Sequence, residues 1–467
     1  MSITGAVMVP HPPLIIPEVG RGQEKAIQAT IDAYHQAERR LAAWKPDTVV
    51  VLSPHSVMYA DYFHISPGTG AEGDFGRFRA PHAKVRVTYD RELVRLICQE
   101  ADRADVPAGT MGEEDRQLDH GTMIPLWFLN QYDRNYQVVR IGLSGLPFSA
   151  HYRLGQCIQR AAERSEKRIA VIASGDLSHR LTKDGPYGFQ EEGPAYDRRI
   201  MDVMGSGEFG GLFDFSEEFC EKAAECGHRS FVIMAGALDS LAVKAERLSH
   251  EGPFGVGYGI CTYEAGGPAP GRDFLRQREE REREALEERK RKEDPYVHLA
   301  RQTIEAWVRG CAGRAKKRIA VPEGLPEEML ARRAGVFVSL KVDGRLRGCI
   351  GTISPVRGSI AEEIMENAIS AACRDPRFHP VEPEELDRLV YSVDVLGKTE
   401  EISSKEELDV KRYGVIVSRG ARRGLLLPNL EGVDTVEEQI DIARQKAGIP
   451  EDAENIRLER FEVVRHF

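Results

Sequence analysis

The first part of the chain alternates apolar runs with stretches of helical period. Three β-branched, apolar runs end in small and polar residues, at 48–56, 136–145 and 168–179. Stretches with helical spacing lie before and after them, notably 23–44 and 230–242. This alternation predicts an α/β domain of three layers, with a central, mostly parallel or mixed sheet covered on both faces. Ligands of such sheets lie beyond the carboxyl ends of the strands, where the informative polar residues of this chain fall.

A highly charged segment interrupts this pattern at residues 272–294. Acidic and basic residues are balanced there and stand three and four positions apart, which favours a solvated helix. The preceding GGPAPG at 266–271 predicts a turn. We therefore expect domains at 1–268 and 295–467, joined by a charged helical linker at 269–294. The alternative is a surface helix that belongs to one domain.

The second domain mixes strand-like stretches with separate helices. The expected helices are 295–309, 359–373 and 436–447, and the expected strands are 335–353, 389–396, 414–418 and 424–427. Because these strands do not alternate regularly with helices, the pattern predicts an α+β domain rather than a doubly wound sheet.

Composition and charge argue against a nucleic-acid-binding, membrane or disulfide-rich protein. The 467 residues are 41% hydrophobic and 30% charged with a net charge of -10, so the chain as a whole lacks the basic surface of nucleic-acid-binding proteins. It has no run of about 18 apolar residues, and the proline-rich N-terminal stretch does not resemble a signal peptide. The eight cysteines form no C-x-x-C pair, which argues against a disulfide framework or a cysteine-rich zinc site. We expect a cytoplasmic protein without a membrane or nucleic-acid partner.

Five polar residues of the first domain share a setting, because each lies at a strand end or in a turn rich in glycine or proline. They are His11, His55, His120, His179 and Glu225. One histidine in such a place is ordinarily a hydrogen-bonded turn residue, but four at comparable places suggest a shared site. Two neutral imidazoles and one carboxylate form the ligand set of non-haem Fe(II) oxygenases, and nearby histidines supply proton transfer. The same ligand types bind catalytic zinc, so Zn(II) is the alternative to Fe(II).

The motifs around these residues follow a known order. HPPLIIPEVG near the start, SPHS after a strand, LDHGTMIPLWF, SGDLSH and a glutamate before an apolar helix resemble the motifs of class III (LigB-like) extradiol dioxygenases, whose fold the Memo proteins share. The resemblance implies that His11, His55 and Glu225 bind Fe(II). It also implies that His179 is the catalytic acid and base and that His120 hydrogen-bonds the substrate or oxygen. The substrate would be a catechol-like aromatic compound opened with O₂.

The third metal ligand has alternatives close to Glu225. Memo proteins place a cysteine near this position, and Cys226 is adjacent in this chain. Glu225 and Cys226 cannot both point equally into one site. Glu264 is a third candidate, but it lies on the far side of a glycine-rich strand. His228 is more typical of a residue outside the ligand set, so both rank below Glu225 and Cys226.

The second domain carries motifs of its own. RGCIGT at 347–352 and DPRF at 375–378 resemble the AMMECR domain, which often accompanies Memo-type and radical-SAM proteins in the grouping called AmmeMemoRadiSam. The resemblance implies a pocket or interface, and a radical-SAM or Memo-type protein as a partner, but no established chemistry. Cys349 is either a nucleophile or, more simply, a small buried residue flanked by glycines.

Basic residues of the second domain suggest two kinds of contact. Arg347, joined by Arg374 or Arg377, is suited to an anion or a carboxylate. The cluster RGARR at 419–423 is suited to RNA, but without interleaved aromatic residues it is more simply a solvated hairpin tip.

Three functions therefore compete. The first is a ferrous dioxygenase fused to an AMMECR domain. The second is a Memo-like protein that binds a metal without ring cleavage and recruits a partner, and the third is a hydrolase that uses zinc with the same ligands. Dimerisation is common among proteins of this kind, which makes a homodimer a further expectation.

Overall fold

The computed structural model describes residues 3–114, 116–311, 319–342, 344–430, 432–451, 453 and 455–467. The chain divides into two compact units, Met1–Glu280 and Arg281–Phe467. The boundary between them falls within helix α9 (Phe274–Lys292). Across the described ranges, no helix combines the length and the apolar character needed to span a membrane.

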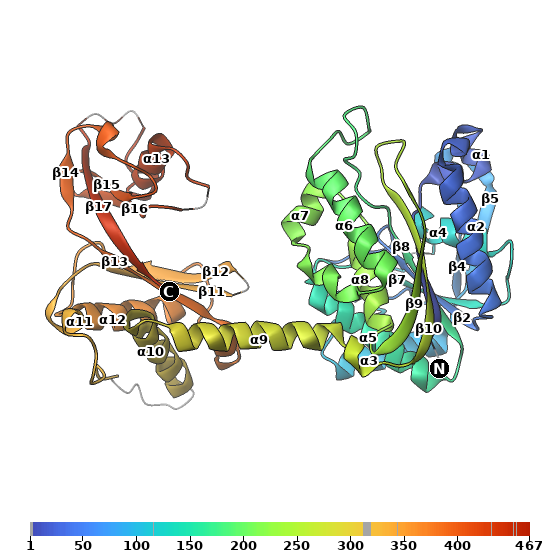
Figure 1. The fold of residues 1–467 in the computed structure, drawn as a ribbon, viewed down its shortest axis with the longest axis horizontal. Coiled ribbons are helices and arrows are strands. Elements are labelled where there is room, and N and C mark those ends of the chain that lie inside the picture. Colours follow the sequence, from blue (N-terminus) through green and yellow to red (C-terminus); the bar gives the residue numbers. More distant parts are fainter. Residues whose placement is uncertain are drawn as a thin grey trace. The chain divides into compact units, whose positions relative to one another are not determined.

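A six-stranded sheet forms the centre of the first unit, in the order β7-β2-β8-β1-β10-β9 (Figure 1). Its strands are β1 (Ile3–Val9), β2 (Thr48–Ser53), β7 (Gln137–Gly142), β8 (Ile169–Ser174), β9 (Leu241–Glu251) and β10 (Tyr258–Pro268). The first four strands of that order are parallel, and β10 and β9 continue the sheet in antiparallel pairing. The sheet is thus mixed, as predicted.

Both faces of this sheet are buried, because successive residues of a strand enter different cores. In β1, Ala6 and Met8 pack into one core and Val7 and Val9 into the other. The first core is completed by α3 (Arg91–Arg103), α5 (Phe148–Ser165), α6 (Glu192–Ser206) and α8 (His228–Ala237), and the second by α2 (Gln28–Ala43) and α4 (His120–Leu129). The predicted three-layer α/β architecture is confirmed.

Shorter elements complete the first unit. They are α1 (Pro17–Gly20), β3 (Phe63–His64), β4 (Gly70–Phe75), β5 (Ala80–Thr88), β6 (Ala108–Gly109) and α7 (Glu217–Ala223). β3 pairs with β6 and β4 with β5, so both pairs lie outside the central sheet.

The sequence pattern located the central strands better than the edge of the sheet. The runs at 48–56, 136–145 and 168–179 contain β2, β7 and β8. The helix expected at 230–242 ends at Ala237 instead, because the chain turns into β9. β9 is an edge strand rich in charged residues, and such strands lack the apolar run that marks a central strand.

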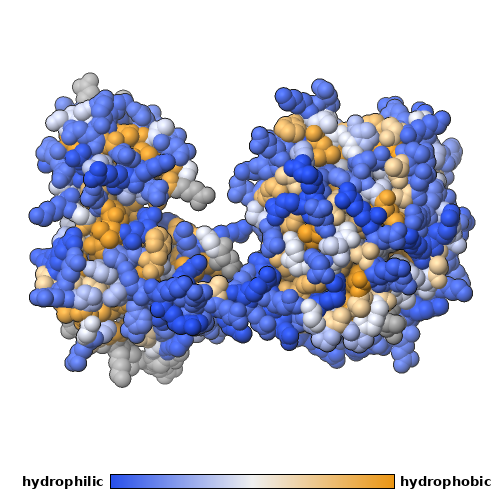
Figure 2. Space-filling view, in the orientation of Figure 1, coloured by the Kyte–Doolittle hydropathy of each residue, from blue (hydrophilic) through white to orange (hydrophobic). Residues whose placement is uncertain are grey.

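The charged segment forms helix α9, whose first two residues are apolar. Phe274 and Leu275 are buried in the first core. The rest of the helix is mainly solvated, with ion pairs between residues one turn apart, such as Lys292 and Glu288 at 2.6 Å. Figure 2 shows that hydrophilic residues cover most of the visible surface of both units, with apolar residues in small patches.

The second unit is built on an antiparallel sheet in the order β12-β11-β13-β17-β15-β16, with β14 paired to β17. The strands are β11 (Val336–Val342), β12 (Arg345–Gly351), β13 (Val390–Leu396), β14 (Glu400–Ile402), β15 (Tyr413–Arg419), β16 (Arg422–Leu426) and β17 (Arg457–His466). The helices are α10 (Pro295–Cys311), α11 (Glu327–Ala331), α12 (Ile360–Cys373) and α13 (Val436–Lys446). α10 and α12 share a core with β11 and β13, and α13 packs on β15 and β16. The predicted α+β class is confirmed.

The backbones of α5 and α8 pack closely enough to exclude a side chain. A Cβ atom at Gly236 would lie 2.1 Å from the carbonyl oxygen of Tyr152, and one at Gly155 would lie 2.1 Å from that of Ile233. We expect Gly236→Ala to lower the free energy of unfolding of the first unit by about 1–3 kcal/mol, because the methyl group must push two helices apart. Urea denaturation followed by tryptophan fluorescence measures this change.

Gly271→Ala is the matched control, because a Cβ atom at Gly271 would meet no atom within 4 Å. If both variants unfold at the same urea concentration as the unmodified chain, the close approach of α5 and α8 does not constrain the fold.

Candidate metal centre

The carboxyl ends of three neighbouring strands carry most of the candidate site. β8 lies between β1 and β2 and pairs in parallel with both. His11 follows β1, His55 follows β2, and Asp176 and His179 follow β8. Because parallel strands end at the same edge of a sheet, residues far apart in the sequence meet there.

His11 is held in one orientation by buried hydrogen bonds. Its Nδ1 lies 2.9 Å from the Ser174 Oγ, and that hydroxyl donates its hydrogen to the carbonyl oxygen of Gly121 at 2.7 Å. The Ser174 oxygen must then accept from His11, which places the imidazole proton on Nδ1 and leaves the lone pair of Nε2 free. The backbone N–H of His11 also donates to Asp176 at 2.7 Å. This arrangement presents His11 as a neutral imidazole with a ligand nitrogen facing the site.

His55 brings a second imidazole nitrogen to the same place. Its Nε2 lies 3.0 Å from the Nε2 of His11, and the two rings meet edge to face. Burial lowers the pKa of both histidines, and the neighbouring His55 lowers that of His11 further. Atoms that are each about 2.0–2.2 Å from one ion lie roughly 3 Å apart, so the separation of the two nitrogens suits a shared metal ion.

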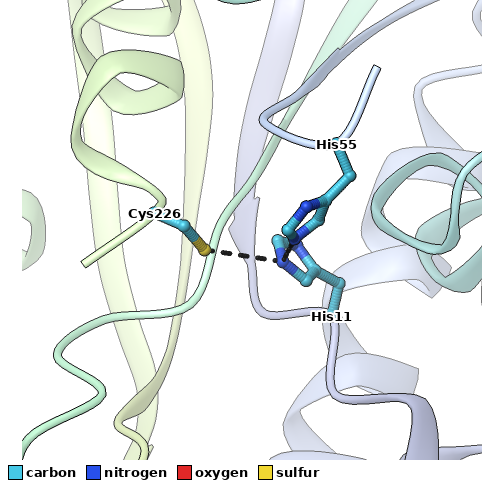
Figure 3. A group of neighbouring side chains, drawn as sticks. All are labelled: His11, His55 and Cys226. Carbon is cyan, nitrogen blue, oxygen red and sulfur yellow. Dashed lines mark hydrogen bonds between the residues drawn. The ribbon is translucent and has the colours of Figure 1, made fainter. Parts of the chain in front are cut away.

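Cys226 supplies a third donor from the loop before α8. In Figure 3 its thiol points toward the two imidazoles, with Sγ 3.5 Å from the Nε2 of His11. The ligand atoms of Cys226 and the two histidines all lie within 4.8 Å of one another. Burial raises the pKa of the Cys226 thiol, and the acidic groups of Asp176 and Glu225 raise it further. A metal ion would oppose this effect, because coordination deprotonates a thiol.

Glu225, the expected third ligand, is directed elsewhere. One oxygen of its carboxylate accepts the backbone N–H of His228 at 2.5 Å, in the first turn of α8. Burial raises the pKa of Glu225 to about 7, whereas the hydrogen bonds from His228 and Gly227 lower it. The free N–H groups at a helix start attract a carboxylate, which accounts for its direction. The structure thus brings His11 and His55 together with Cys226 rather than with Glu225.

A second group of potential ligands shares the same thiol. The ligand atoms of Asp176, His179 and Cys226 also lie within 4.8 Å of one another. Asp176 is buried, which raises its pKa to about 7, although the hydrogen bond from the His11 backbone lowers it. Sequence reasoning singled out His179 in the motif SGDLSH and missed Asp176. The available signal was its position two residues after the end of a buried strand.

His179 and His120 border the site without joining the group of three donors around His11. Nε2 of His179 is buried and has no hydrogen-bond partner among the residues that the structure describes, and its ring lies 5.0 Å from that of Tyr187. His120 begins α4 and stacks on His55, with ring centroids 4.2 Å apart. Burial and then the charge of His55 lower the pKa of each to about 4. Both are therefore neutral bases near neutral pH.

The remaining ligand candidates lie away from this cluster. The ring of His228 is buried, with Nε2 3.1 Å from the carbonyl oxygen of Leu212 and Nδ1 3.3 Å from the hydroxyl of Tyr196. Glu264 is exposed on β10 and pairs with Gly5, near the opposite end of β1 from His11.

The donor set fits a metal ion of the iron or zinc type. Two imidazole nitrogens and a thiol are accepted by both metals, and a buried carboxylate lies close by in Asp176. The fixed orientation of His11 is the arrangement expected of a metal-binding histidine, whose second nitrogen donates to a neighbouring group. The ligand types do not distinguish Fe(II) from Zn(II).

The motif residues of the second unit are engaged within that unit. Each motif arginine pairs with a carboxylate: Arg347 with Glu385, Arg374 with Glu366 and Arg377 with Asp375. An external anion would have to compete with these groups. Arg422 and Arg423 lie where β16 begins, at the hairpin expected from the RGARR cluster. Cys349 is partly exposed, which corrects the simpler interpretation that it is a small buried residue.

Both units match known protein families. Residues 5–261 match the family described as the catalytic LigB subunit of aromatic ring-opening dioxygenase, and residues 297–466 match AMMECR1. A protein of Clostridium acetobutylicum is 41% identical over 474 residues, which cover 100% of this chain and 99% of that protein. A Thermotoga maritima protein is 54% identical over 175 residues, or 37% of this chain and 98% of that protein. A crystal structure of an uncharacterized protein from Pyrococcus horikoshii is 35% identical with a TM-score of 0.33, and the match covers 36% of this chain and 88% of that one.

The two family matches confirm the resemblance of the motifs to the LigB and AMMECR families. The LigB match covers more than half of the chain, and the relative from Clostridium acetobutylicum extends over both units. The chain belongs to the family of the catalytic LigB subunit of aromatic ring-opening dioxygenases and carries an AMMECR1 domain in the same polypeptide.

Proposed function

We propose that the first unit is an Fe(II)-dependent dioxygenase that opens a small catechol-like substrate with O₂. The observation that carries this proposal is the convergence of two neutral imidazoles and a thiol, from His11, His55 and Cys226, on one point. Membership in a family of aromatic ring-opening dioxygenases supports the class of reaction and substrate.

Three donors would hold the metal ion. Nε2 of His11, Nε2 of His55 and the thiolate of Cys226 would bind the ion. Bound Fe(II) with free positions would bring an aromatic diol and O₂ together and accept electron density from the ring. Asp176 accepts a hydrogen bond from the backbone N–H of His11 and would supply negative charge close to a bound ion.

The two remaining histidines are suited to handle protons and orient the substrate. Nε2 of His179 is a buried acceptor with no hydrogen-bond partner in the described part of the chain, so it can take a proton from a substrate hydroxyl and later return it. His120 is fixed by its stacking on His55 and can hydrogen-bond a substrate oxygen. The low pKa values of both histidines, about 4, keep them in the neutral form that these roles require.

The thiol favours a second candidate function. Cys226 takes the place of the carboxylate that completes the usual ligand set of non-haem iron oxygenases, and zinc sites commonly use thiolates. The alternative is a cytoplasmic metal-binding protein that does not cleave rings and that recruits a radical-SAM or Memo-type protein.

One experiment separates the two functions. Metal analysis of anaerobically purified protein identifies the ion, and an oxygen electrode then records O₂ uptake with a panel of catechols. Iron together with O₂ uptake supports the dioxygenase. If iron-loaded protein consumes no O₂ with any catechol, the dioxygenase proposal falls and the binding function is favoured.

Cys226 and Glu225 are expected to differ sharply in metal binding. We expect Cys226→Ala to weaken the affinity for Fe(II) or Zn(II) by at least about tenfold, because it removes a donor atom. We expect Glu225→Gln to leave the affinity within about twofold and to lower stability by about 0.5–2 kcal/mol, because the side chain hydrogen-bonds the start of α8. Metal titration by calorimetry, with thermal unfolding as a check on folding, compares the two variants. Loss of the metal from the Glu225→Gln variant alone would show that the carboxylate is the ligand.

His179 is expected to affect turnover without affecting metal content. Substitution of His179 by alanine removes the proposed proton acceptor, so turnover with a catechol that supports O₂ uptake should fall by about 10²–10⁴-fold. Metal content should stay the same, because His11, His55 and Cys226 are intact. The matched control is His82→Ala, which removes an exposed imidazole of β5. Unchanged turnover in the His179→Ala variant would remove the proton role.

A further inference from the structure

The donor groups around Cys226 fall into two sets that share its sulfur. The ligand atoms of His11, His55 and Cys226 lie within 4.8 Å of one another, and those of Asp176, His179 and Cys226 meet the same limit. Among the residues that the structure describes, the five donors thus form two sets of three rather than one set of five. The function proposed above uses only the first set to bind metal, so the ligand atoms of the second set are left to explain.

Cys226 lies where one sulfur atom can serve both sets. Its Sγ is 3.5 Å from the Nε2 of His11, and it accepts the backbone N–H of Asp176 at 3.3 Å. The thiol therefore borders both the loop after β1 and the loop after β8. A thiolate has more than one lone pair, so it can bind two ions at once. Its negative charge between them also reduces their mutual repulsion.

His179 brings an unused nitrogen to the second set. Its Nε2 is buried, yet it has no hydrogen-bond partner within the described ranges of the chain. A buried polar atom without a partner costs free energy, and a bound ligand removes that cost. With the imidazole proton on Nδ1, the Nε2 of His179 carries a lone pair that a cation can accept.

Asp176 supplies the negative charge that a second ion requires. The residue is only 7% exposed, and its Oδ1 accepts the backbone N–H of His11 at 2.7 Å. Its Oδ2 has no hydrogen-bond or ion-pair partner in the part of the chain that the structure describes. A buried carboxylate without a cationic partner is unfavourable, and a divalent ion would provide that partner.

We propose that the Cys226 thiolate bridges two divalent ions and that the second ion, held by Asp176 and His179, inhibits turnover. Zinc suits the second set, because thiolate, imidazole and carboxylate are its usual ligands. An imidazole nitrogen bound to zinc has no lone pair with which to accept a proton, so the second ion removes the base. The effect on turnover rests on the function proposed above, in which His179 is the proton acceptor, whereas the second ion site does not.

The two ions bind in sequence. The first occupies the set that contains His11 and His55, because Ser174 already holds the His11 ring in the orientation that binding requires. The second ion is repelled by the first across the shared sulfur, so its affinity is lower. The chain is therefore active with one bound ion and inhibited when zinc is in excess.

Equilibrium dialysis of the reduced, metal-free full-length protein against Zn²⁺ counts the ions. We expect two ions per chain for the unmodified protein and one for His179→Ala or His55→Ala, because each variant loses a ligand of one set only. His82→Ala is the matched control, since it removes an exposed imidazole of β5 and should keep both ions. Thermal unfolding verifies that the variants are folded. One ion in the unmodified chain, or two in His179→Ala, would overturn the second site.

Asp176→Asn tests the carboxylate while keeping an oxygen that can accept the His11 N–H. We expect it to weaken the second ion by at least about tenfold and to leave the first within about threefold, because only the second set loses a charged ligand. Equal affinities for both ions in this variant and in the unmodified chain would exclude Asp176 as a ligand.

Co²⁺ tests whether the two ions share the sulfur. Two Co²⁺ ions bridged by one thiolate couple their electron spins, so the electron paramagnetic resonance signal per ion should fall when the second equivalent binds. A signal that doubles with the second equivalent would show that the ions do not share Cys226, and the bridge would be wrong.

O₂ uptake tests the inhibition separately. Zn²⁺ is added to Fe(II)-loaded protein with a catechol that supports O₂ uptake, and the iron content is measured to verify that zinc does not displace iron. We expect turnover to fall by at least about tenfold as the second ion binds, because the base is lost, and to return when a chelator removes the zinc. Full turnover with both ions bound would refute the inhibition. No O₂ uptake before zinc is added would refute the proposed function instead, and the dialysis and the Co²⁺ signal would still decide the second site.

Discussion

The parallel pairing of β8 with both β1 and β2 is the constraint on which the candidate metal centre depends. This pairing sets Val9 opposite Ser174, so the last residue of β8 lies beside the histidine that follows β1. A shift of register by one residue would turn the Ser174 hydroxyl to the other face of the sheet and release His11. The proton position on His11, and with it the direction of its ligand lone pair, is thus set by the sheet.

Burial makes this cluster of ionisable groups largely neutral when no cation is present. It lowers the pKa of His11 and His55, and it raises those of Asp176 and Cys226. A divalent ion reverses the balance, because it stabilises a thiolate and a carboxylate that burial otherwise disfavours. Metal binding would therefore release protons, and affinity would rise as the pH rises.

How far the sequence predicts this structure depends on which interactions decide each feature. Central strands are buried on both faces, so apolar runs predicted β2, β7 and β8, and the ends of β2 and β8 pointed to His55 and His179. Which of Glu225 and Cys226 faces the histidines could not be predicted, because neighbouring residues share the same sequence context. The start of α8 decides between them, since its free N–H groups attract the carboxylate and leave the thiol facing the histidines.

Glycines in both units help to explain why short motifs indicate a site but not its chemistry. A Cβ atom at Gly121 would lie 2.5 Å from the Ser53 hydroxyl and 3.4 Å from the His11 ring, so that glycine lets the start of α4 reach the metal centre. Gly348 plays the corresponding part between β12 and α12. In each motif, close packing requires the glycine. Close packing does not specify the contact of the residue beside it, which is that of His120 with His55 or of Cys349 with Ser339. What that neighbour can do depends on the side chains that the fold brings to it.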